Sequence, residues 1–173
     1  MHALVVGGTR ILRPAAAELV GRTWQVTVLA RGATHDPPGR FAAPVDARDA
    51  EALAAALDAA IAARGPFALA LVYAPFAPAA AMVAIAARVP GRLVHVLTSR
   101  WGAPDSDRRV RDVWAPDGAG ATQRLTLGWT RAGDATRWHT PDEVSRGVLD
   151  LVEDGAAEAT LGALRPWSAR PAP

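Results

Sequence analysis

The sequence contains no lysine and no cysteine, so all 19 of its basic residues are arginine. The absence of lysine excludes Schiff-base catalysis, a P-loop lysine and any mechanism that needs an ammonium group. The absence of cysteine excludes disulfides, thiolate nucleophiles and cysteine-ligated metals, and it fits a cytoplasmic protein most simply. Only four histidines are present, and their spacing matches no metal-binding motif.

The charge balance is modest, since 17 acidic residues bring the formal net charge to +2. The arginines are dispersed among these acids rather than clustered, so we expect no nucleic-acid partner. Half of the residues are apolar and 21% are charged, which is typical of a globular protein and not of a disordered one. Since domains have roughly 100–200 residues, a chain of 173 residues is expected to form one domain.

One long segment, residues 65–87, carries no charge. It is long enough to span a bilayer, but Pro66, Pro75 and Pro78 would break backbone hydrogen bonds where water cannot replace them. We therefore expect a buried strand, a turn and a helix here, and no membrane contact. The first residues also lack the basic region of a secretory signal, which again favours the cytoplasm.

Apolar runs and helix-favouring segments alternate along the chain. Residues 3–6 (ALVV) form a continuous apolar run, typical of a strand buried on both faces of a parallel sheet. Further strands are predicted over 25–30, 45–46, 67–73, 93–98 and 123–129, and helices over 14–20, 49–63, 78–88 and about 141–153. Gly21 is expected to be the left-handed C-cap of the first helix, and Thr140 to Glu143 form a capping box. The alternation predicts the α/β class, as a single three-layer domain with a doubly wound, Rossmann-like parallel sheet.

Two segments fall outside this alternation. Residues 101–121 are polar and rich in Asp, Arg, Gly and Pro, and they are interpreted either as a lid over the site or as a solvated loop without function. Residues 165–173 are expected to be a disordered tail. The predicted dinucleotide-binding domain therefore covers residues 1–164.

A glycine pair follows the first predicted strand and precedes the first predicted helix. This arrangement brings backbone N–H groups up to an anion, and glycine allows a pyrophosphate to approach closely. The alternative is a tight turn that holds no ligand. The predicted cofactor-binding residues of this loop are Gly7, Gly8, Thr9, Arg10, Ile11 and Leu12. Arg10 and Arg13 near the positive end of a helix would be better placed with a phosphate between them, although both can also be solvated.

At these positions the chain resembles the short-chain dehydrogenase/reductase superfamily, and especially its small bacterial members, which open with a strand and GGTGML. The resemblance covers most of the chain, because residues 94–100 (VHVLTSR) and 125–155 are also similar. The glycine spacing of the extended and atypical members falls on Gly7, Arg10 and Arg13, so two of the three glycines are replaced. The resemblance implies a nicotinamide cofactor, a small-molecule substrate and a Rossmann fold.

The residues after the second and third predicted strands bear on the choice of cofactor. Arg31 stands where NAD-binding sites usually carry an acid, and an arginine suits the 2′-phosphate of NADP. By resemblance, Asp46 and Ala47 would lie beside the adenine. Asp46 has an equally plain alternative role, which is to cap the turn before the next helix.

The catalytic residues of the superfamily are serine, tyrosine and lysine, and this set cannot exist without lysine. The only tyrosine is Tyr73, after the fourth predicted strand, and Ser99 matches the serine position after VHVLT. We predict Tyr73 and Ser99 as the catalytic residues. The alternatives are a packed aromatic ring for Tyr73 and a strand-end cap for Ser99. His95 lies within an apolar strand and is expected to be a core residue.

These observations leave three functions open. The first is an NADP-dependent oxidoreductase that reduces a small carbonyl, imine or enone. The second is a regulatory protein that binds NADPH without turnover, and the third is a cofactor-independent isomerase or cyclase that reuses the cleft. Six tryptophans in so short a chain also suggest a homodimer.

Overall fold

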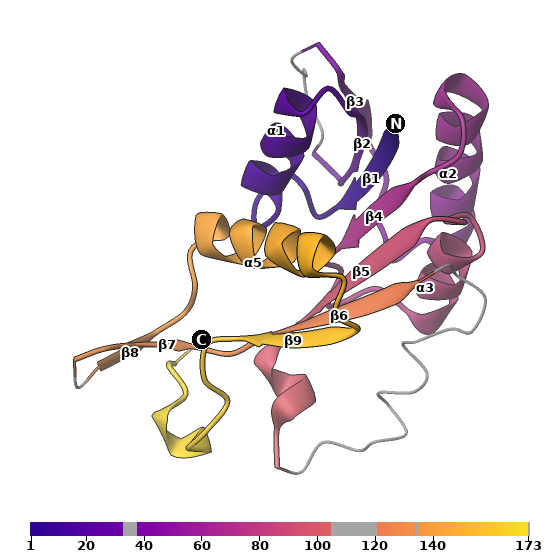
Figure 1. The fold of residues 1–173 in the computed structure, drawn as a ribbon. Helices are drawn as coiled ribbons and strands as arrows, with labels where there is room; N and C mark the ends of the chain where they lie inside the picture. The colour runs from indigo at the N-terminus through magenta and orange to yellow at the C-terminus, as the bar shows by residue number, and fades with distance from the viewer. Residues whose placement is uncertain (33–37, 105–120, 134, 173) are drawn as a thin grey trace.

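The computed structural model describes residues 1–32, 38–104, 121–133 and 135–172. Seven parallel strands form one sheet in the order β3-β2-β1-β4-β5-β6-β9 (Figure 1). The strands are β1 (His2–Val6), β2 (Gln25–Leu29), β3 (Arg40–Ala43), β4 (Leu69–Val72), β5 (Arg92–Leu97), β6 (Thr122–Leu127) and β9 (Glu158–Leu161). The predicted class, a doubly wound parallel sheet in a single α/β domain, is therefore confirmed.

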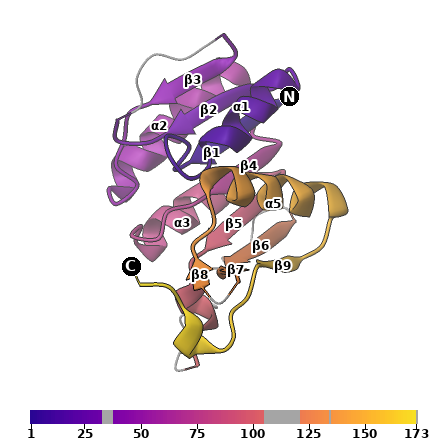
Figure 2. The ribbon, with the colours of Figure 1, turned by 90° about the vertical axis from the view of Figure 1, so that its left-hand side faces the viewer.

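Helices cover both faces of the sheet, as the two views in Figures 1 and 2 show. The helices are α1 (Arg13–Gly21), α2 (Ala50–Arg64), α3 (Ala79–Ala86) and α5 (Pro141–Asp154). Ala3 and Val5 of β1 belong to the core cluster that includes α1 and α5, whereas Leu4 and Val6 belong to the cluster with α2 and α3. Because successive side chains of a strand point to opposite faces, both of which are covered here, residues 3–6 of β1 have to be apolar.

Two helices begin at a side-chain cap, and the one at α5 is the predicted capping box. Asp49 accepts a hydrogen bond from the Ala52 N–H at the start of α2. At α5 the capping box is complete, since the Thr140 hydroxyl accepts from the Glu143 N–H and the Glu143 carboxylate accepts from the Thr140 N–H. Gly155 closes α5 with a φ of 71°. Helix α5 is therefore fixed at both ends by local bonds.

The prediction that Gly21 is a left-handed cap is wrong. Helix α1 includes Gly21, and the left-handed residue is Thr23, with a φ of 64°. The Trp24 N–H donates to the Leu19 carbonyl and the Thr23 N–H to the Val20 carbonyl, so this turn is a Schellman motif with threonine where glycine is usual.

The predicted strand at 45–46 is also wrong, because the third strand is β3, residues 40–43, which pairs with β2. Strand β3 lies at the sheet edge and is only partly buried, so its sequence RFAA carries little apolar signal. Three further strands have no counterpart in the prediction, namely β7 (Thr130–Ala132), β8 (Ala135–Arg137) and β9. Strands β7 and β8 form an antiparallel hairpin beyond the end of β6.

The described end of the chain, residues 165–172, returns to this hairpin. A short 3-10 helix, Trp167–Ala169, places the Trp167 ring 5.8 Å from that of the fully buried Trp129. The Trp138 indole N–H donates to the Ala172 carbonyl at 2.8 Å. These tryptophans therefore pack within the chain. Residues 165–172, expected to be a disordered tail, thus contact the rest of the domain in the structure. The boundary at residue 164 and the homodimer stay predictions, and most of the predicted lid, 101–121, lies outside the described residues.

Candidate functional site

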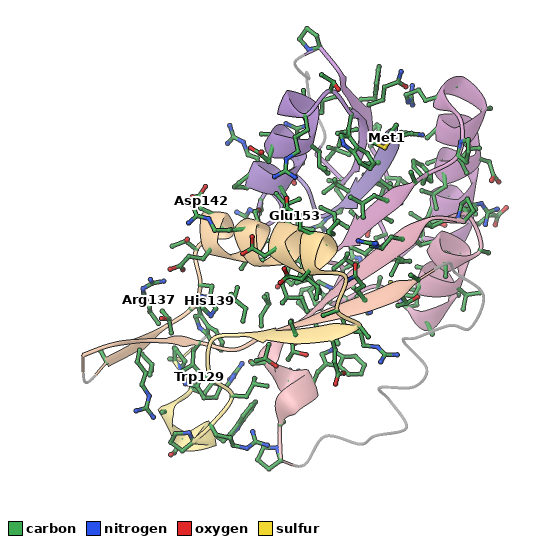
Figure 3. All side chains as sticks on the ribbon, viewed as in Figure 1. Met1, Trp129, Arg137, His139, Asp142 and Glu153 are labelled. Atoms are coloured by element: carbon green, nitrogen blue, oxygen red, sulfur yellow. The ribbon has the colours of Figure 1, made fainter. Side chains whose placement is uncertain are left out.

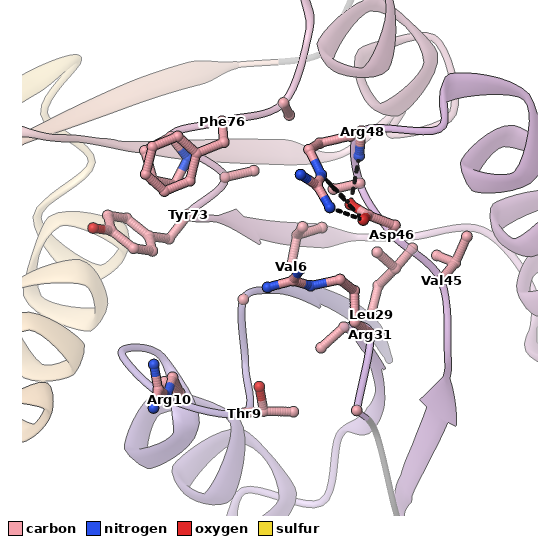
Figure 4. Close-up of a pocket in the computed structure, with 17 residues that line it drawn as sticks. Val6, Thr9, Arg10, Leu29, Arg31, Val45, Asp46, Arg48, Tyr73 and Phe76 are labelled. Carbon is pink, nitrogen blue, oxygen red and sulfur yellow. Dashed lines mark hydrogen bonds and ion pairs between the residues drawn. The ribbon is translucent and has the colours of Figure 1, made fainter.

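The main cleft lies at the carboxyl ends of β1, β2 and β4, where the strand order reverses direction on either side of β1 (Figure 4). Its volume is about 380 Å³. It is lined by residues 6–7, 9–10, 29–32, 45–48 and 73–77. Doubly wound sheets bind their ligands at such a point, because the chain leaves neighbouring strands in opposite directions there.

The glycine turn forms one wall of this cleft. Gly7 has a φ of 84°, and a Cβ atom at this position would lie 2.5 Å from the Tyr73 carbonyl oxygen. The Gly7 N–H donates to the Leu29 carbonyl at 3.2 Å. At Gly8 a Cβ atom would lie 2.9 Å from Cγ1 of Val5. Both glycines are therefore required by the packing of the turn against its own sheet, with or without a ligand.

The six predicted loop residues do not all face the cleft. Gly7, Thr9 and Arg10 line it. Leu12 is fully buried in the core, and the Ile11 carbonyl accepts a hydrogen bond from the Ser145 hydroxyl of α5 at 3.2 Å. Helix α1 begins after Leu12 without a side-chain cap, and Pro14 in its first turn removes one N–H donor. Gly7, Thr9 and Arg10 thus contribute to the cleft, whereas Gly8, Ile11 and Leu12 do not line it.

Two arginines bring positive charge to the cleft. Arg31 follows β2 and Arg10 belongs to the glycine turn, and both are exposed and line the cleft (Figure 4). Within the described part of the chain, neither guanidinium has an ion-pair or hydrogen-bond partner. Arginine cannot lose its charge near neutral pH, so both groups are permanently charged hydrogen-bond donors for an anion.

Asp46 and Ala47 also line the cleft, but the Asp46 carboxylate is already engaged. Arg48 Nη2 donates to Asp46 Oδ2 at 2.7 Å, Arg48 Nε lies 3.1 Å from both oxygens, and the Arg48 N–H donates to Oδ1 at 3.0 Å. The side-chain hydrogen bond from Arg48 is the largest cause that lowers the pKa of Asp46, to about 2. Arg48 was missed in the sequence, where only its two-residue spacing from Asp46 could have indicated the turn.

Tyr73 and Phe76 form the aromatic part of the cleft. Tyr73 is partly buried, and this burial raises the pKa of its phenol above the ordinary value near 10. No neighbouring charge contributes to that shift. Phe76 is 85% exposed, an unusual state for such a large apolar ring, and its place in the cleft was not predicted. At neutral pH Tyr73 is therefore a neutral hydrogen-bond donor.

Ser99, the other predicted catalytic residue, lies apart from this cleft. It follows β5 at the start of the short 3-10 helix Ser99–Gly102 and is only 3% exposed. Its hydroxyl accepts a hydrogen bond from Arg170 Nε at 3.1 Å. Ser99 is not among the residues that line the cleft, whereas Tyr73 is.

Two other site types find no support among the described residues. No group of three histidine, aspartate or glutamate side chains in the described ranges is placed to hold a metal ion. In the same ranges, no helix is both long and apolar enough to cross a membrane. His95, expected to be a core residue, is 3% exposed within β5.

Known proteins provide an independent comparison. No family model and no curated protein matches the sequence. Among solved structures, a variant of a short-chain dehydrogenase/reductase from Serratia marcescens superposes with a TM-score of 0.69 at 16% identity, over 94% of each chain. The chain has the Rossmann fold of the short-chain dehydrogenases/reductases.

Two further short-chain dehydrogenase/reductase structures lead to the same assignment. A short-chain dehydrogenase from Streptomyces avermitilis gives a TM-score of 0.68 at 15% identity, over 94% of this chain and 88% of that chain. An NADPH-bound variant of the actinorhodin polyketide ketoreductase gives 0.63 at 15% identity, over 93% of this chain and 95% of that chain. The resemblance that the sequence suggested is confirmed at the level of the short-chain dehydrogenase/reductase fold.

Proposed function

We propose that this protein is an oxidoreductase of the short-chain dehydrogenase type that binds NADPH in the cleft and reduces a small carbonyl, imine or enone. The observation that carries the proposal is Arg31. Its guanidinium lines the cleft at the end of β2 and has no hydrogen-bond or ion-pair partner among the described residues, although its charge is a minor cause that lowers the pKa of Asp46. A cation at the end of the second strand suits the 2′-phosphate of NADP, whereas an acid there suits the free ribose hydroxyl of NAD.

The other groups in the cleft fit a dinucleotide. Gly7 allows the chain to turn next to the sheet edge, and Arg10 supplies a second cation for the phosphates. Ala47 offers a small apolar contact for a base. Asp46 does not fit an adenine contact as well, because Arg48 engages both oxygens of its carboxylate, so we assign Asp46 to the turn. When bound, NADPH would supply the hydride, and the chain would orient it.

The proton for a reduction has few sources in this chain. Tyr73 is the one phenol of the sequence and lies in the cleft, with a raised pKa that keeps it protonated. Ser99 is buried and hydrogen-bonded to Arg170. We therefore assign proton donation to Tyr73. The same observations favour a second candidate, a protein that binds NADPH without turnover, because a phenol with a raised pKa is a weak acid.

Binding tests the cofactor assignment. We expect NADPH to bind more tightly than NADH, and Arg31→Gln to lower the affinity for NADPH alone. A charge-assisted hydrogen bond contributes about 1.5–3 kcal/mol, so the loss should be about tenfold or more. Arg13→Gln is the matched control, since Arg13 is exposed on α1 but does not line the cleft. Equal affinities for the two cofactors, or no effect of Arg31→Gln, would refute the assignment.

Turnover separates the two candidates. With a panel of small carbonyl, imine and enone compounds, an oxidoreductase consumes NADPH, and Tyr73→Phe slows this consumption without weakening NADPH binding by a similar factor. Binding without consumption across the panel would support the regulatory candidate instead.

A further inference from the structure

The end of the chain builds a cluster of one arginine and three tryptophans. Arg170 lies over the rings of Trp138 and Trp167, with its guanidinium carbon 4.9 and 5.4 Å from the two centroids. The Trp129 ring meets both indoles edge-on, at 6.5 and 5.8 Å. Trp129 is fully buried, and Figure 3 shows it beside the C-terminal segment. The cluster therefore holds the Arg170 side chain against an ordered aromatic surface.

The hydrogen bonds of Arg170 leave part of its guanidinium unused. Nε donates to Ser99 Oγ at 3.1 Å, and within the described ranges no protein acceptor or carboxylate engages the two Nη groups. Indole faces remove water from the flat sides of a guanidinium but offer no acceptor for its N–H groups. A partly buried arginine with two free amino groups is a donor fork that matches the two oxygens of a carboxylate.

This fork lies near the same edge of the sheet as the cleft. Ser99 follows β5, and Tyr73 follows the neighbouring strand β4, which pairs with β5 in parallel register. Ligands of doubly wound sheets lie across the carboxyl ends of the strands, so a substrate next to a dinucleotide in the cleft extends toward β5 and β6. Arg170 lies on that side of the cleft, because it donates to Ser99 just beyond the end of β5.

We infer that the Nη groups of Arg170 bind the carboxylate of the substrate, and that the substrate is a small oxo acid. That the bound molecule is a substrate rests on the proposed function, but the carboxylate site itself does not depend on a cofactor. Trp138 and Trp167 are positioning residues, since they fix the plane of the guanidinium. Ser99 is a positioning residue as well, because its hydroxyl accepts from Nε and so leaves the two Nη groups to bind a ligand.

The test is a titration of the full chain with pyruvate in the absence of cofactor, followed in spectra of the protein with ¹⁵N-labelled tryptophan. The chain has six indole N–H groups, and single Trp→Phe variants identify their signals. We expect pyruvate to shift the Trp138 and Trp167 signals in a saturable way, and methyl pyruvate, which lacks the charge, to leave them unchanged. No saturable shift, or equal shifts with the ester, overturns the inference.

Variants test whether Arg170 is the group that binds. Arg170→Gln should weaken pyruvate binding about tenfold or more, whereas Arg170→Lys should retain part of it because the charge remains. Arg131→Gln is the control, since Arg131 is an exposed arginine of the nearby hairpin. The six indole signals of each variant show whether it is folded. Unchanged pyruvate binding in folded Arg170→Gln refutes the site.

The outcome also separates this inference from the proposed function. NADPH binding without a pyruvate shift overturns the carboxylate site and leaves the cofactor assignment standing. A pyruvate shift that depends on Arg170, in a protein that does not bind NADPH, supports the site and removes the proposed reduction.

Discussion

Replacement of Gly7 by alanine should destabilise the protein, whereas the same change at Gly21 should stabilise it. Gly7 has a φ of 84°, in the left-handed region, and its added Cβ would lie 2.5 Å from the Tyr73 carbonyl oxygen. Tyr73 directly follows β4, and its N–H donates to the Val6 carbonyl at 3.0 Å, so its backbone is held at the end of the sheet. The clash therefore cannot be relieved by the rotation of a side chain.

The magnitude follows from two effects. A left-handed conformation costs an ordinary L-residue roughly 1–2 kcal/mol, and a steric overlap in a packed region typically adds roughly 1–3 kcal/mol. We therefore expect a loss of about 3 kcal/mol in the free energy of unfolding. For a chain of this size, 1 kcal/mol shifts the melting temperature by about 2–4 °C, so Gly7→Ala should melt about 6–12 °C below the wild type.

Gly21→Ala is the matched control. Gly21 is the last residue of α1, and apart from its chain neighbours and the backbone of its own helix no atom stands within 4 Å of the position where its Cβ would be. Alanine in a helix is favoured over glycine by roughly 0.5–1 kcal/mol, so this variant should melt slightly above the wild type. Differential scanning calorimetry measures the melting temperatures of both variants and of the wild type. A melting temperature of Gly7→Ala equal to that of the wild type, or a clear loss in Gly21→Ala, would refute the reasoning.

Two further predictions concern the capped ends of helices and turns. Thr140→Ala removes the hydroxyl of the capping box and should lower the free energy of unfolding, measured in urea, by about 0.5–2 kcal/mol. Thr140→Ser keeps the hydroxyl and should change this free energy little. Equal losses in the two variants would contradict the capping role. The folded-state pKa of Asp46 is about 2, below its ordinary value, so its contribution to stability is present above about pH 4 and is lost as the pH falls toward about 2. The urea midpoint of the wild type should therefore fall more steeply over this range than that of Asp46→Asn, and parallel profiles would show that the Arg48 pair does not stabilise the fold.

The parts of the fold that were predicted correctly have signals that lie within a few neighbouring residues. Residues 3–6 of β1 are an unbroken apolar run because both faces of the strand are buried, and α5 has its cap, its proline and its final glycine in local sequence. Strand β9 has no such signal. Its residues EATL are mostly exposed, and it is held at the sheet edge by pairing with β6. The left-handed Thr23 was missed because the Schellman turn tolerates a residue that propensity disfavours there.

Part of the candidate site could likewise be predicted from the sequence, and part could not. The fold brings Gly7, Arg10, Arg31 and Tyr73 to one cleft because each lies just beyond the carboxyl end of a central strand, and such positions can be counted from the sequence. The hydrogen bond between Ser99 and Arg170 could not be predicted, because it joins residues 71 positions apart across the edge of the domain. Periodicity and local motifs contain no information on a contact of this kind.

The absence of lysine limits the chemical roles that the strongly basic side chains of this protein can have. Each of the 19 residues counted as lysine or arginine is an arginine, which keeps its proton near neutral pH, so none of these side chains can serve as a proton donor or acceptor in a reaction. The arginines of the cleft and of the tryptophan cluster can bind and orient anions only. If Tyr73, the phenol that lines the cleft, protonates the product, Tyr73→Phe should slow turnover while NADPH still binds. If turnover survives in Tyr73→Phe, the proton comes from the substrate or from water, and the cleft contributes only binding and orientation.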